Sequence, residues 1–377
     1  METPASMNKP LLMIPGPMDP PEEVLRRCGM PVFPHYEGDF PAFYHQLTDK
    51  LRYVFGTEDG TVYVPNGSGT TAVNMMLASL CTPEDSVLVA NNGSFGDYAE
   101  RNLQCLGVPH VAVKAERGAA VDCDKVRDEM KRSRHPFLYV VHNESSTAVL
   151  NPLPPLGEIA REFDALLLVD GVSSVGGVVI DMDGSGADVV AGASQKCLEL
   201  PPGLAPVAVG PRARQYMKAM KVRRVPYVLD FMMWDWSLDT RGNSHPQLTT
   251  GATTMLYALD WIVDRIREEG IESRQERFRA AGQRLKAGFR ELGFTTATPP
   301  RNASPVVSEL IVPDGMTAAE LRNYYITEHN TMVGGGGRKN AKGKGSSFRV
   351  AHFGRAAEYE RIDRLIEITR EFVAGKA

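Results

Sequence analysis

Lys196 occupies a position in this chain that favours reactive chemistry. It follows the apolar segment 188–193 and precedes a turn-forming Pro-Pro-Gly at 201–203. An amine at the end of a buried strand is largely removed from water, which lowers its pKa and makes it available to form a Schiff base with an aldehyde. The alternative is a lysine whose charged tip reaches the surface along its own aliphatic stem.

Asp170 follows a second apolar segment, 165–169. Open α/β sheets bind their ligands at the carboxyl ends of their strands. A carboxylate at that position can pair with a cationic ring nitrogen. The alternative is an aspartate that caps a turn.

A glycine-rich turn, NGSGT at 66–70, leads into a helix expected at 71–80. Free backbone N–H groups and the positive end of a helix dipole together bind phosphate. Ser68, Gly69 and Thr70 are therefore candidate phosphate ligands. The same pattern is also typical of a helix that is simply capped by Ser or Thr.

Together, these three features match the three anchors of pyridoxal 5′-phosphate (PLP): its phosphate, its ring nitrogen and its aldehyde. Phe95 and Ser145 each follow a further apolar segment. Phe95 can stack on the cofactor ring, and Ser145 can bond the ring's phenolic oxygen or Asp170. Their alternatives are an ordinary core aromatic and a turn serine. The sequence therefore predicts a PLP site without a metal.

The elements that must position these residues begin with short, uniformly apolar segments. Uniform rather than alternating hydrophobicity is typical of strands buried on both faces, as in a parallel sheet covered by helices. Helical patterns lie between many of them, for example at 155–163, so the sequence predicts a doubly wound α/β domain. The apolar segments are 61–65, 86–90, 110–113, 137–141, 165–169, 188–193 and 204–209.

Near residue 255 the pattern changes to that of a smaller α+β domain. We expect helices at 255–270, 272–292 and 317–328 and from about 357, with strands at 306–312 and 347–353. The predicted division is an N-terminal arm (1–20), a large cofactor domain (21–254) and a small C-terminal domain (255–377). The glycine- and lysine-rich stretch 334–345 is interpreted as a mobile basic loop.

The bulk composition narrows the possible classes of protein. The chain has 377 residues and a formal net charge of -4, which argues against nucleic-acid and membrane-surface partners. Its five cysteines form no CxxC pair, so a disulfide framework or a zinc site is not expected. The first ten residues lack the pattern of a secretory leader, and a cytoplasmic enzyme is predicted.

In these candidate cofactor residues and their spacing, the sequence resembles the class V aminotransferases, and within them the alanine–glyoxylate / serine–pyruvate group. The resemblance covers nearly the whole chain, from LLMIPGPMDPPEEVL at 11–25 onward. It includes NGSGTTA, HNESSTAVLNPL, VDGVSSVGG, SQKCLELPPGL and FRVAHFG. It implies the fold type I architecture of PLP-dependent transferases, and a homodimer whose active sites lie at the subunit interface.

The resemblance also implies roles for single residues. Lys196 would carry PLP, and Asp170 would pair with its ring nitrogen. Arg349 would bind the substrate α-carboxylate, which suits a planar guanidinium. The remaining implied roles are phosphate contact by Ser68, Gly69, Thr70 and Gln195, ring stacking by Phe95, ring packing by Val172, and cofactor contact by Ser145.

Three positions depart from the family pattern or stay open. A segment before the helix at 255 would reach the neighbouring subunit's phosphate, with Thr250 at the matching position. Gln247 replaces the usual tyrosine there. Glu199 stands where many relatives have a small or neutral residue, and it either alters the pocket or lies at the surface.

The predicted function is transfer of an amino group from a small amino acid, of the alanine or serine type, to glyoxylate or pyruvate. Alternatives are a transaminase of 2-aminoethylphosphonate or ureidoglycine, for which the basic loop would assist an anionic group, and a PLP-dependent lyase or desulfurase. A catalytically inactive binding protein on the same fold is a further alternative. Side-chain specificity depends on pocket walls that the sequence does not fix.

Overall fold

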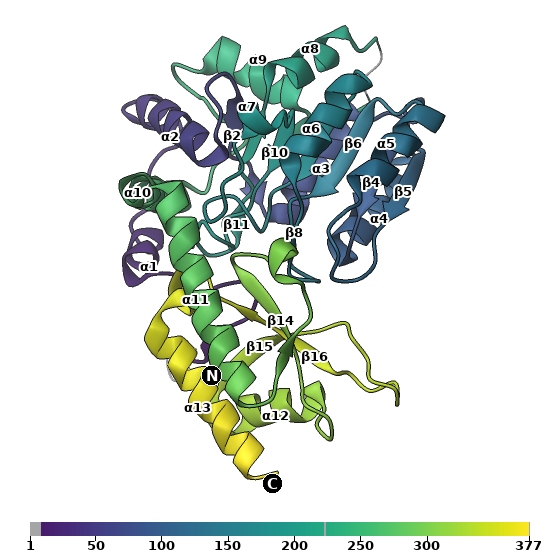
Figure 1. The fold of residues 1–377 in the computed structure, drawn as a ribbon. Helices are drawn as coiled ribbons and strands as arrows, with labels where there is room; N and C mark the ends of the chain where they lie inside the picture. The colour runs from purple at the N-terminus through teal and green to yellow at the C-terminus, as the bar shows by residue number, and fades with distance from the viewer. Residues whose placement is uncertain (1–8, 222–223, 377) are drawn as a thin grey trace.

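A seven-stranded sheet forms the centre of the larger part of the molecule (Figure 1). The protein is described by a computed structural model that covers residues 9–221 and 224–376; residues 1–8, where the predicted N-terminal arm begins, lie outside it. The strand order is β2-β12-β10-β9-β6-β4-β5, and only β12 runs antiparallel to its neighbours. The strands are β2 (Thr61–Tyr63), β4 (Val87–Asn91), β5 (His110–Lys114), β6 (Phe137–Val141), β9 (Leu166–Asp170), β10 (Val189–Ala191) and β12 (Val207–Val209).

Helices cover both faces of this sheet, which is why its central strands are apolar throughout. Every residue of β4, β6 and β9 is buried. On β6, Leu138 and Val140 pack towards one layer of helices, whereas Phe137, Tyr139 and Val141 pack towards the other. The first layer contains α2 (Phe40–Phe55), α5 (Cys123–Arg132), α6 (Leu153–Glu162) and α10 (Thr253–Glu269), and the second contains α3 (Gly69–Leu80), α4 (Ser94–Leu106), α8 (Pro211–Ala219) and α9 (Phe231–Arg241). The predicted doubly wound, mostly parallel domain is confirmed.

A second, five-stranded sheet lies at the other end of the molecule, in the order β1-β15-β16-β14-β13. Its strands are β1 (Leu11–Met13), β13 (Thr295–Thr296), β14 (Val307–Ile311), β15 (Thr331–Gly335) and β16 (Ser347–Ala351). Strand β1, from the N-terminal region, pairs in parallel with β15. The start of the stretch predicted as a mobile loop is therefore ordered, because Gly334 and Gly335 belong to β15 and pair with β16.

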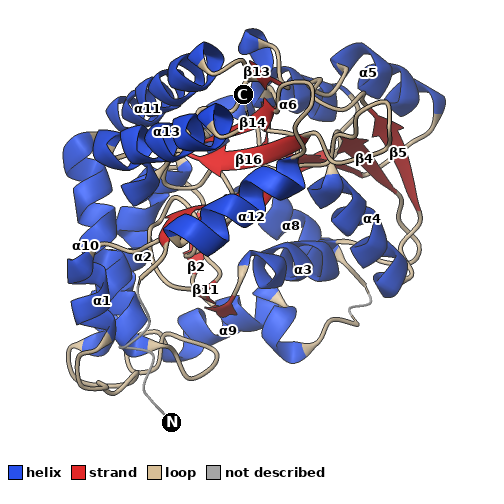
Figure 2. Ribbon diagram, turned by 90° about the horizontal axis from the view of Figure 1, so that it is seen from below, coloured by secondary structure: helices blue, strands red, loops and turns tan. Residues whose placement is uncertain are grey.

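Three helices complete this smaller part: α11 (Ile271–Glu291), α12 (Ala318–His329) and α13 (Tyr359–Ala374). Figure 2 shows them beside β14 and β16. Phe348 on β16 is fully buried among aromatic side chains from α11, α12 and the loop before β13. Helix α10, in contrast, packs its apolar side chains into the core of the seven-stranded sheet. The division at residue 255 stays a prediction.

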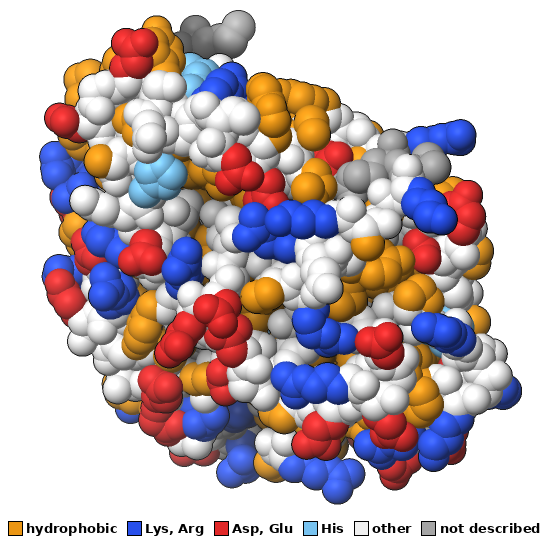
Figure 3. Space-filling model, turned by 90° about the horizontal axis from the view of Figure 1, so that it is seen from above, with side chains coloured by type: hydrophobic (Ala, Val, Ile, Leu, Met, Phe, Trp, Pro, Cys, Tyr) orange, Lys and Arg blue, Asp and Glu red, His pale blue; other side chains and the backbone are white. Residues whose placement is uncertain are grey.

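The surface carries mixed charge. On the face shown in Figure 3, the basic and acidic side chains of the described residues are interspersed and do not gather into a region of one sign. Within residues 9–221 and 224–376, none of the helices combines the length and the apolar character needed to cross a bilayer.

Candidate active site

Lys196 and Asp170 lie close together because their strands are neighbours. Asp170 is the last residue of β9, and it is in register with Ala191, the last residue of β10. Both strands run in the same direction, so the turn that follows β10 carries Lys196 back over the same end of the sheet. The two residues line one cavity, as the sequence predicts.

The amine of Lys196 loses its proton more readily than an exposed lysine. Burial lowers its pKa to about 8, and the nearby charge of Arg349 acts in the same direction. Its Nζ donates a hydrogen bond to the carbonyl oxygen of Pro15. The segment at Pro15 and Gly16 lies directly against the lysine, since a Cβ on Gly16 would meet Nζ at 2.6 Å.

Asp170 is buried, and burial raises the pKa of its carboxyl to about 6. The Val172 N–H donates to Oδ1 at 2.9 Å, and the Tyr139 hydroxyl donates to Oδ2 at 3.3 Å. Both bonds favour the carboxylate, and so does the charge of Lys196. A cation placed against Asp170 would favour it further.

Most of the predicted cofactor residues line a single cavity of about 620 Å³. This volume lies within the usual range for small-molecule sites. The predicted residues that line it are Gly69, Thr70, Phe95, Asp170, Val172, Gln195 and Lys196. Ser68, Ser145, Thr250 and Arg349 do not.

The chemistry of the cavity walls fits PLP at each of its anchors. The N-terminus of α3 opens at Gly69, which is pressed against Val172 so closely that a Cβ would meet its methyl groups at 2.6 Å. Gln195 Oε1, in the cavity wall, and Ser145 Oγ, outside it, are buried and form no hydrogen bond within the described residues. Buried polar atoms without a partner are costly, so a ligand that bonds them is favoured.

Two predicted phosphate contacts lie outside the cavity walls for different reasons. Ser68 caps α3, and its backbone N–H bonds the Thr71 hydroxyl at 3.2 Å. Thr250 is exposed, and its carbonyl accepts a hydrogen bond from Asn66 Nδ2 at 2.6 Å. Gln247, in contrast, is buried within its own chain and donates to the Val64 carbonyl at 3.4 Å. Thr250 therefore does not reach the cavity of its own chain.

Arg349 lies on β16 and reaches the seven-stranded part of the molecule. Its Nε donates to the Gly335 carbonyl at 2.6 Å, and its Nη1 donates to the Ser145 carbonyl at 2.9 Å. It forms no ion pair with any described acidic side chain. A guanidinium held by two carbonyls keeps its full charge, so it can bind a carboxylate.

Glu199 does not line the cavity and is not at the surface, so its interpretation as a surface residue is wrong, and its effect on the pocket stays a prediction. It is buried, its backbone is left-handed (φ 58°), and its carboxylate pairs with Arg274 of α11. Arg274 also donates to the carbonyls of Gly176, at 2.7 Å, and Cys197, at 3.3 Å. The Glu199–Arg274 ion pair therefore holds the turn that contains Lys196 against helix α11.

Sequence reasoning missed several residues of the site. Tyr139 was counted only as part of the apolar segment 137–141, although its hydroxyl bonds Asp170. The available signal is the one hydroxyl-bearing side chain in an otherwise apolar buried strand. Helices α3 and α4 also contribute Val73, Asn74, Tyr98, Ala99, Arg101, Asn102 and Cys105 to the cavity.

Comparisons with known proteins place this geometry in one family. The model of the "Aminotransferase class-V" family matches residues 33–365. An uncharacterized aminotransferase of Methanocaldococcus jannaschii is 32% identical over 95% of this chain and 91% of its own length. The crystal structure of an alanine–glyoxylate aminotransferase from Nostoc sp. superposes with a TM-score of 0.91 at 27% identity, over 98% of this chain and 96% of that one. A ureidoglycine–glyoxylate aminotransferase structure from Bacillus subtilis gives a TM-score of 0.89 at 26% identity, over 97% and 94%.

We predict that Glu199→Ala lowers the free energy of unfolding by about 3 kcal/mol, because it leaves the buried Arg274 short of one acidic partner. The matched control is Glu276→Ala, which removes an exposed carboxylate paired with Arg279 and should cost no more than about 0.5 kcal/mol. Urea unfolding measures both. Equal losses in the two variants would contradict a structural role for the buried pair.

We also predict that Lys196 is methylated by formaldehyde and a mild reductant at a rate that rises with pH, is half-maximal near pH 8 and levels off about one pH unit higher. The neutral amine attacks the aldehyde, and the pKa of about 8 makes it the dominant form above that pH. Mass spectrometry of the Lys196 peptide in the cofactor-free protein follows the reaction. A rate that still climbs steeply at pH 9.5 would show that the amine is not desolvated.

Proposed function

The chain belongs to the class V aminotransferase family, and from this we propose that it is a PLP-dependent transaminase acting on a small amino acid of the alanine or serine type. The acceptor would be a 2-oxo acid such as glyoxylate or pyruvate. The observation that carries the proposal is the shared cavity of Lys196 and Asp170, with the unpaired Arg349 nearby. A cytoplasmic location remains a prediction.

Specific residues would hold the cofactor. Lys196 would bind it covalently through Nζ, and Asp170 would pair with the ring nitrogen. The N-terminus of α3 at Gly69, with Thr70 and Gln195, would bind the phosphate. When bound, PLP supplies an aldehyde that accepts the amino group and a ring that withdraws electrons from the substrate carbon.

The remaining steps belong to the side chains of the chain itself. Arg349 would hold the α-carboxylate and so fix the orientation of the substrate Cα–H bond. The amine of Lys196, once released by the incoming substrate, would remove the proton from Cα. Its pKa of about 8 suits a general base that works near neutral pH. Asp170 would keep a proton on the ring nitrogen.

Burial makes Cys197, the cysteine beside Lys196, unsuited to the role of a desulfurase thiolate. That chemistry needs an accessible thiolate on a mobile segment. Cys197 is fully buried, and burial raises the pKa of its thiol to about 12. A transaminase of ureidoglycine remains the second candidate, because one structural relative is described as such an enzyme.

We predict that alanine or serine converts the purified, PLP-loaded enzyme to its aminated form in a single half-reaction, and that glyoxylate or pyruvate reverses the change. Absorbance spectra follow both directions. Lys196→Ala should abolish the conversion and the borohydride-trappable link between chain and cofactor. Full conversion by this variant would contradict the assignment.

The same assay separates the substrate candidates. Arg349→Met should raise the half-saturating alanine concentration by at least about tenfold, because it removes a charged carboxylate ligand. It should leave 2-aminoethylphosphonate, which has no α-carboxylate, nearly unaffected. Conversion by ureidoglycine but not by alanine would favour the second candidate.

We propose further that the enzyme is a homodimer with shared active sites. Thr250 is exposed and close to the start of α10, so it is available to a neighbouring subunit. Large apolar side chains are exposed at Val32, Tyr36 and Trp236, the first with 84% of its surface accessible. Exposed apolar groups of this size favour a partner that covers them.

A hybrid experiment tests the sharing. Lys196→Ala and Thr250→Arg should each be inactive, because one lacks the reactive amine and the other blocks the neighbouring phosphate site. Co-expression of both chains should restore part of the activity, since one site of a mixed dimer has an intact lysine and an intact threonine. Activity that stays absent in a purified mixed dimer would place each site within one chain.

A further inference from the structure

Glu309 and Arg349 face each other across two strands without forming an ion pair. They are directly opposite in the antiparallel β14–β16 register, so both side chains lie on the same face of the sheet. Opposite charges at such positions normally attract and pair. Arg349 instead directs its N–H groups at the carbonyls of Gly335 and Ser145.

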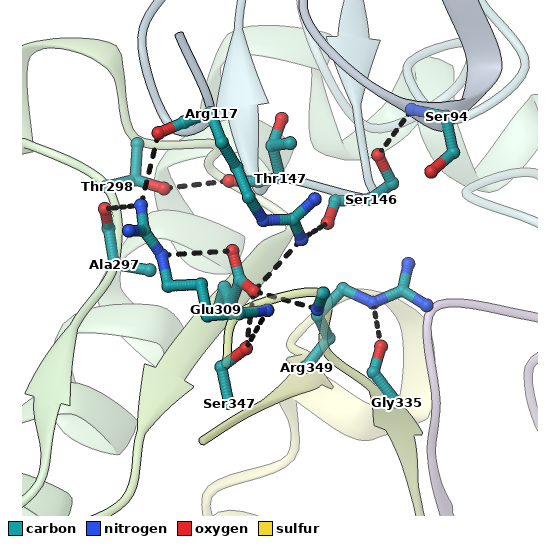
Figure 4. A network of polar contacts seen from close by, with 12 residues as sticks. Ser94, Arg117, Ser146, Thr147, Ala297, Thr298, Glu309, Gly335, Ser347 and Arg349 are labelled. Atoms are coloured by element: carbon teal, nitrogen blue, oxygen red, sulfur yellow. Dashed lines mark hydrogen bonds and ion pairs between the residues drawn. The ribbon is translucent and has the colours of Figure 1, made fainter. Parts of the chain in front are cut away.

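The carboxylate of Glu309 is engaged elsewhere. Its side chain is fully buried, at 0% exposure. Oε1 accepts hydrogen bonds from Arg117 Nη2 at 3.0 Å, Ser347 Oγ at 2.7 Å and the Gly337 N–H at 3.3 Å. Figure 4 shows the carboxylate turned towards Arg117 and away from the guanidinium of Arg349.

Arg117 reaches Glu309 from the other part of the molecule. It lies in the loop between β5 and α5, and the same Nη2 donates to the Ser146 carbonyl at 2.7 Å. The backbone of Gly337 covers its guanidinium, since a Cβ there would meet Cζ at 2.6 Å. The Ser146 carbonyl, the Glu309 carboxylate and the backbone of Gly337 therefore hold Arg117 in place.

A second arginine approaches Glu309 but does not replace Arg117. Arg338 Nε lies 4.0 Å from Oε2, which is beyond hydrogen-bond distance. Its Nη2 is already bound to the carbonyls of Arg117, at 3.1 Å, and Ala297, at 3.0 Å. These contacts also correct the interpretation of Arg338 as part of a solvated loop, whereas Lys339, Lys342 and Lys344 are exposed.

We propose that Arg117 is a positioning residue that occupies Glu309 and thereby leaves Arg349 free to bind the substrate carboxylate. The inference rests on the proposed function of Arg349. A buried carboxylate requires a cation, and Arg349 is directly across the sheet from Glu309. Without Arg117, Glu309 would pair with Arg349 and compete with the substrate.

Three variants test this competition: Arg117→Met, Glu309→Gln and the double variant. The measurement is the dissociation constant of propionate, a carboxylate without an amino group, for the PLP-loaded full-length enzyme by calorimetry. We expect Arg117→Met to weaken binding by at least about tenfold, because a buried charge pair then opposes the ligand. Glu309→Gln alone should stay within about threefold of the wild type, since the competing charge is gone.

The double variant is decisive. If Arg117 acts by engaging Glu309, removing that carboxylate restores propionate binding to within about threefold of the wild type. If Arg117 only supports the turn at Ser146, the double variant stays as weak as Arg117→Met, and the proposal is overturned. Weaker binding in Glu309→Gln alone would also overturn it.

Controls separate this proposal from the function on which it rests. Arg127→Met removes a partly exposed arginine paired with Glu162 at 3.0 Å and should leave propionate binding unchanged. A wild-type enzyme that fails the alanine half-reaction would refute the proposed function itself. If Arg117→Met does not fold, two other variants test the proposal. Arg117→Lys, which keeps the charge, should bind propionate as tightly as the wild type. Weak propionate binding by the folded double variant would still overturn the proposal.

Discussion

The rest of this structure depends on one constraint: the amine of Lys196 and the carboxyl of Asp170 are both buried, away from water, at the same end of a parallel sheet. Burial moves the pKa of Lys196 down to about 8 and that of Asp170 up to about 6, so each group is held nearer its neutral form than it would be in solvent. Such burial costs stability. The register of β9 and β10 imposes it, because the two strands end together.

The substrate end of the site depends on a different structural feature, the turn after β7 (Asn143–Glu144). The Glu144 carboxylate accepts hydrogen bonds from the backbone N–H groups of Phe95, at 3.0 Å, and Ser146, at 2.9 Å. These bonds join the turn to the start of α4. The carbonyls of Ser145 and Ser146 bind Arg349 and Arg117. One turn thus places the aromatic residue beside the cavity and the arginine from the second sheet, and a shift in it would move both.

The sequence contains enough to predict the fold class and the reactive pair, because both are local signals. Uniformly apolar segments indicate strands buried on two faces; Asp170 follows one of them directly, and Lys196 follows another after two residues. The strand order is not local, and nothing in the segment 137–141 shows that Tyr139 would lie next to Asp170. The resemblance to the family supplied Arg349 and Thr250. Only the folded chain shows that Arg349 binds the Ser145 carbonyl and that Thr250 is exposed outside the cavity of its own chain.

Charged residues were the hardest to interpret from sequence, and for a common physical reason. Whether a glutamate or an arginine is solvated, structural or functional depends on which opposite charge folding brings to it. Glu199 and Arg274, like Glu309 and Arg117, are far apart in the chain and meet only through tertiary packing. Each buried carboxylate holds arginines beside it, and an arginine that pairs with none of the described acids is then available to a ligand. Among the described residues, Arg349 beside Lys196 has no acidic partner, so under the proposed function the pairing of its neighbours, as much as its own position, leaves it able to bind a substrate carboxylate.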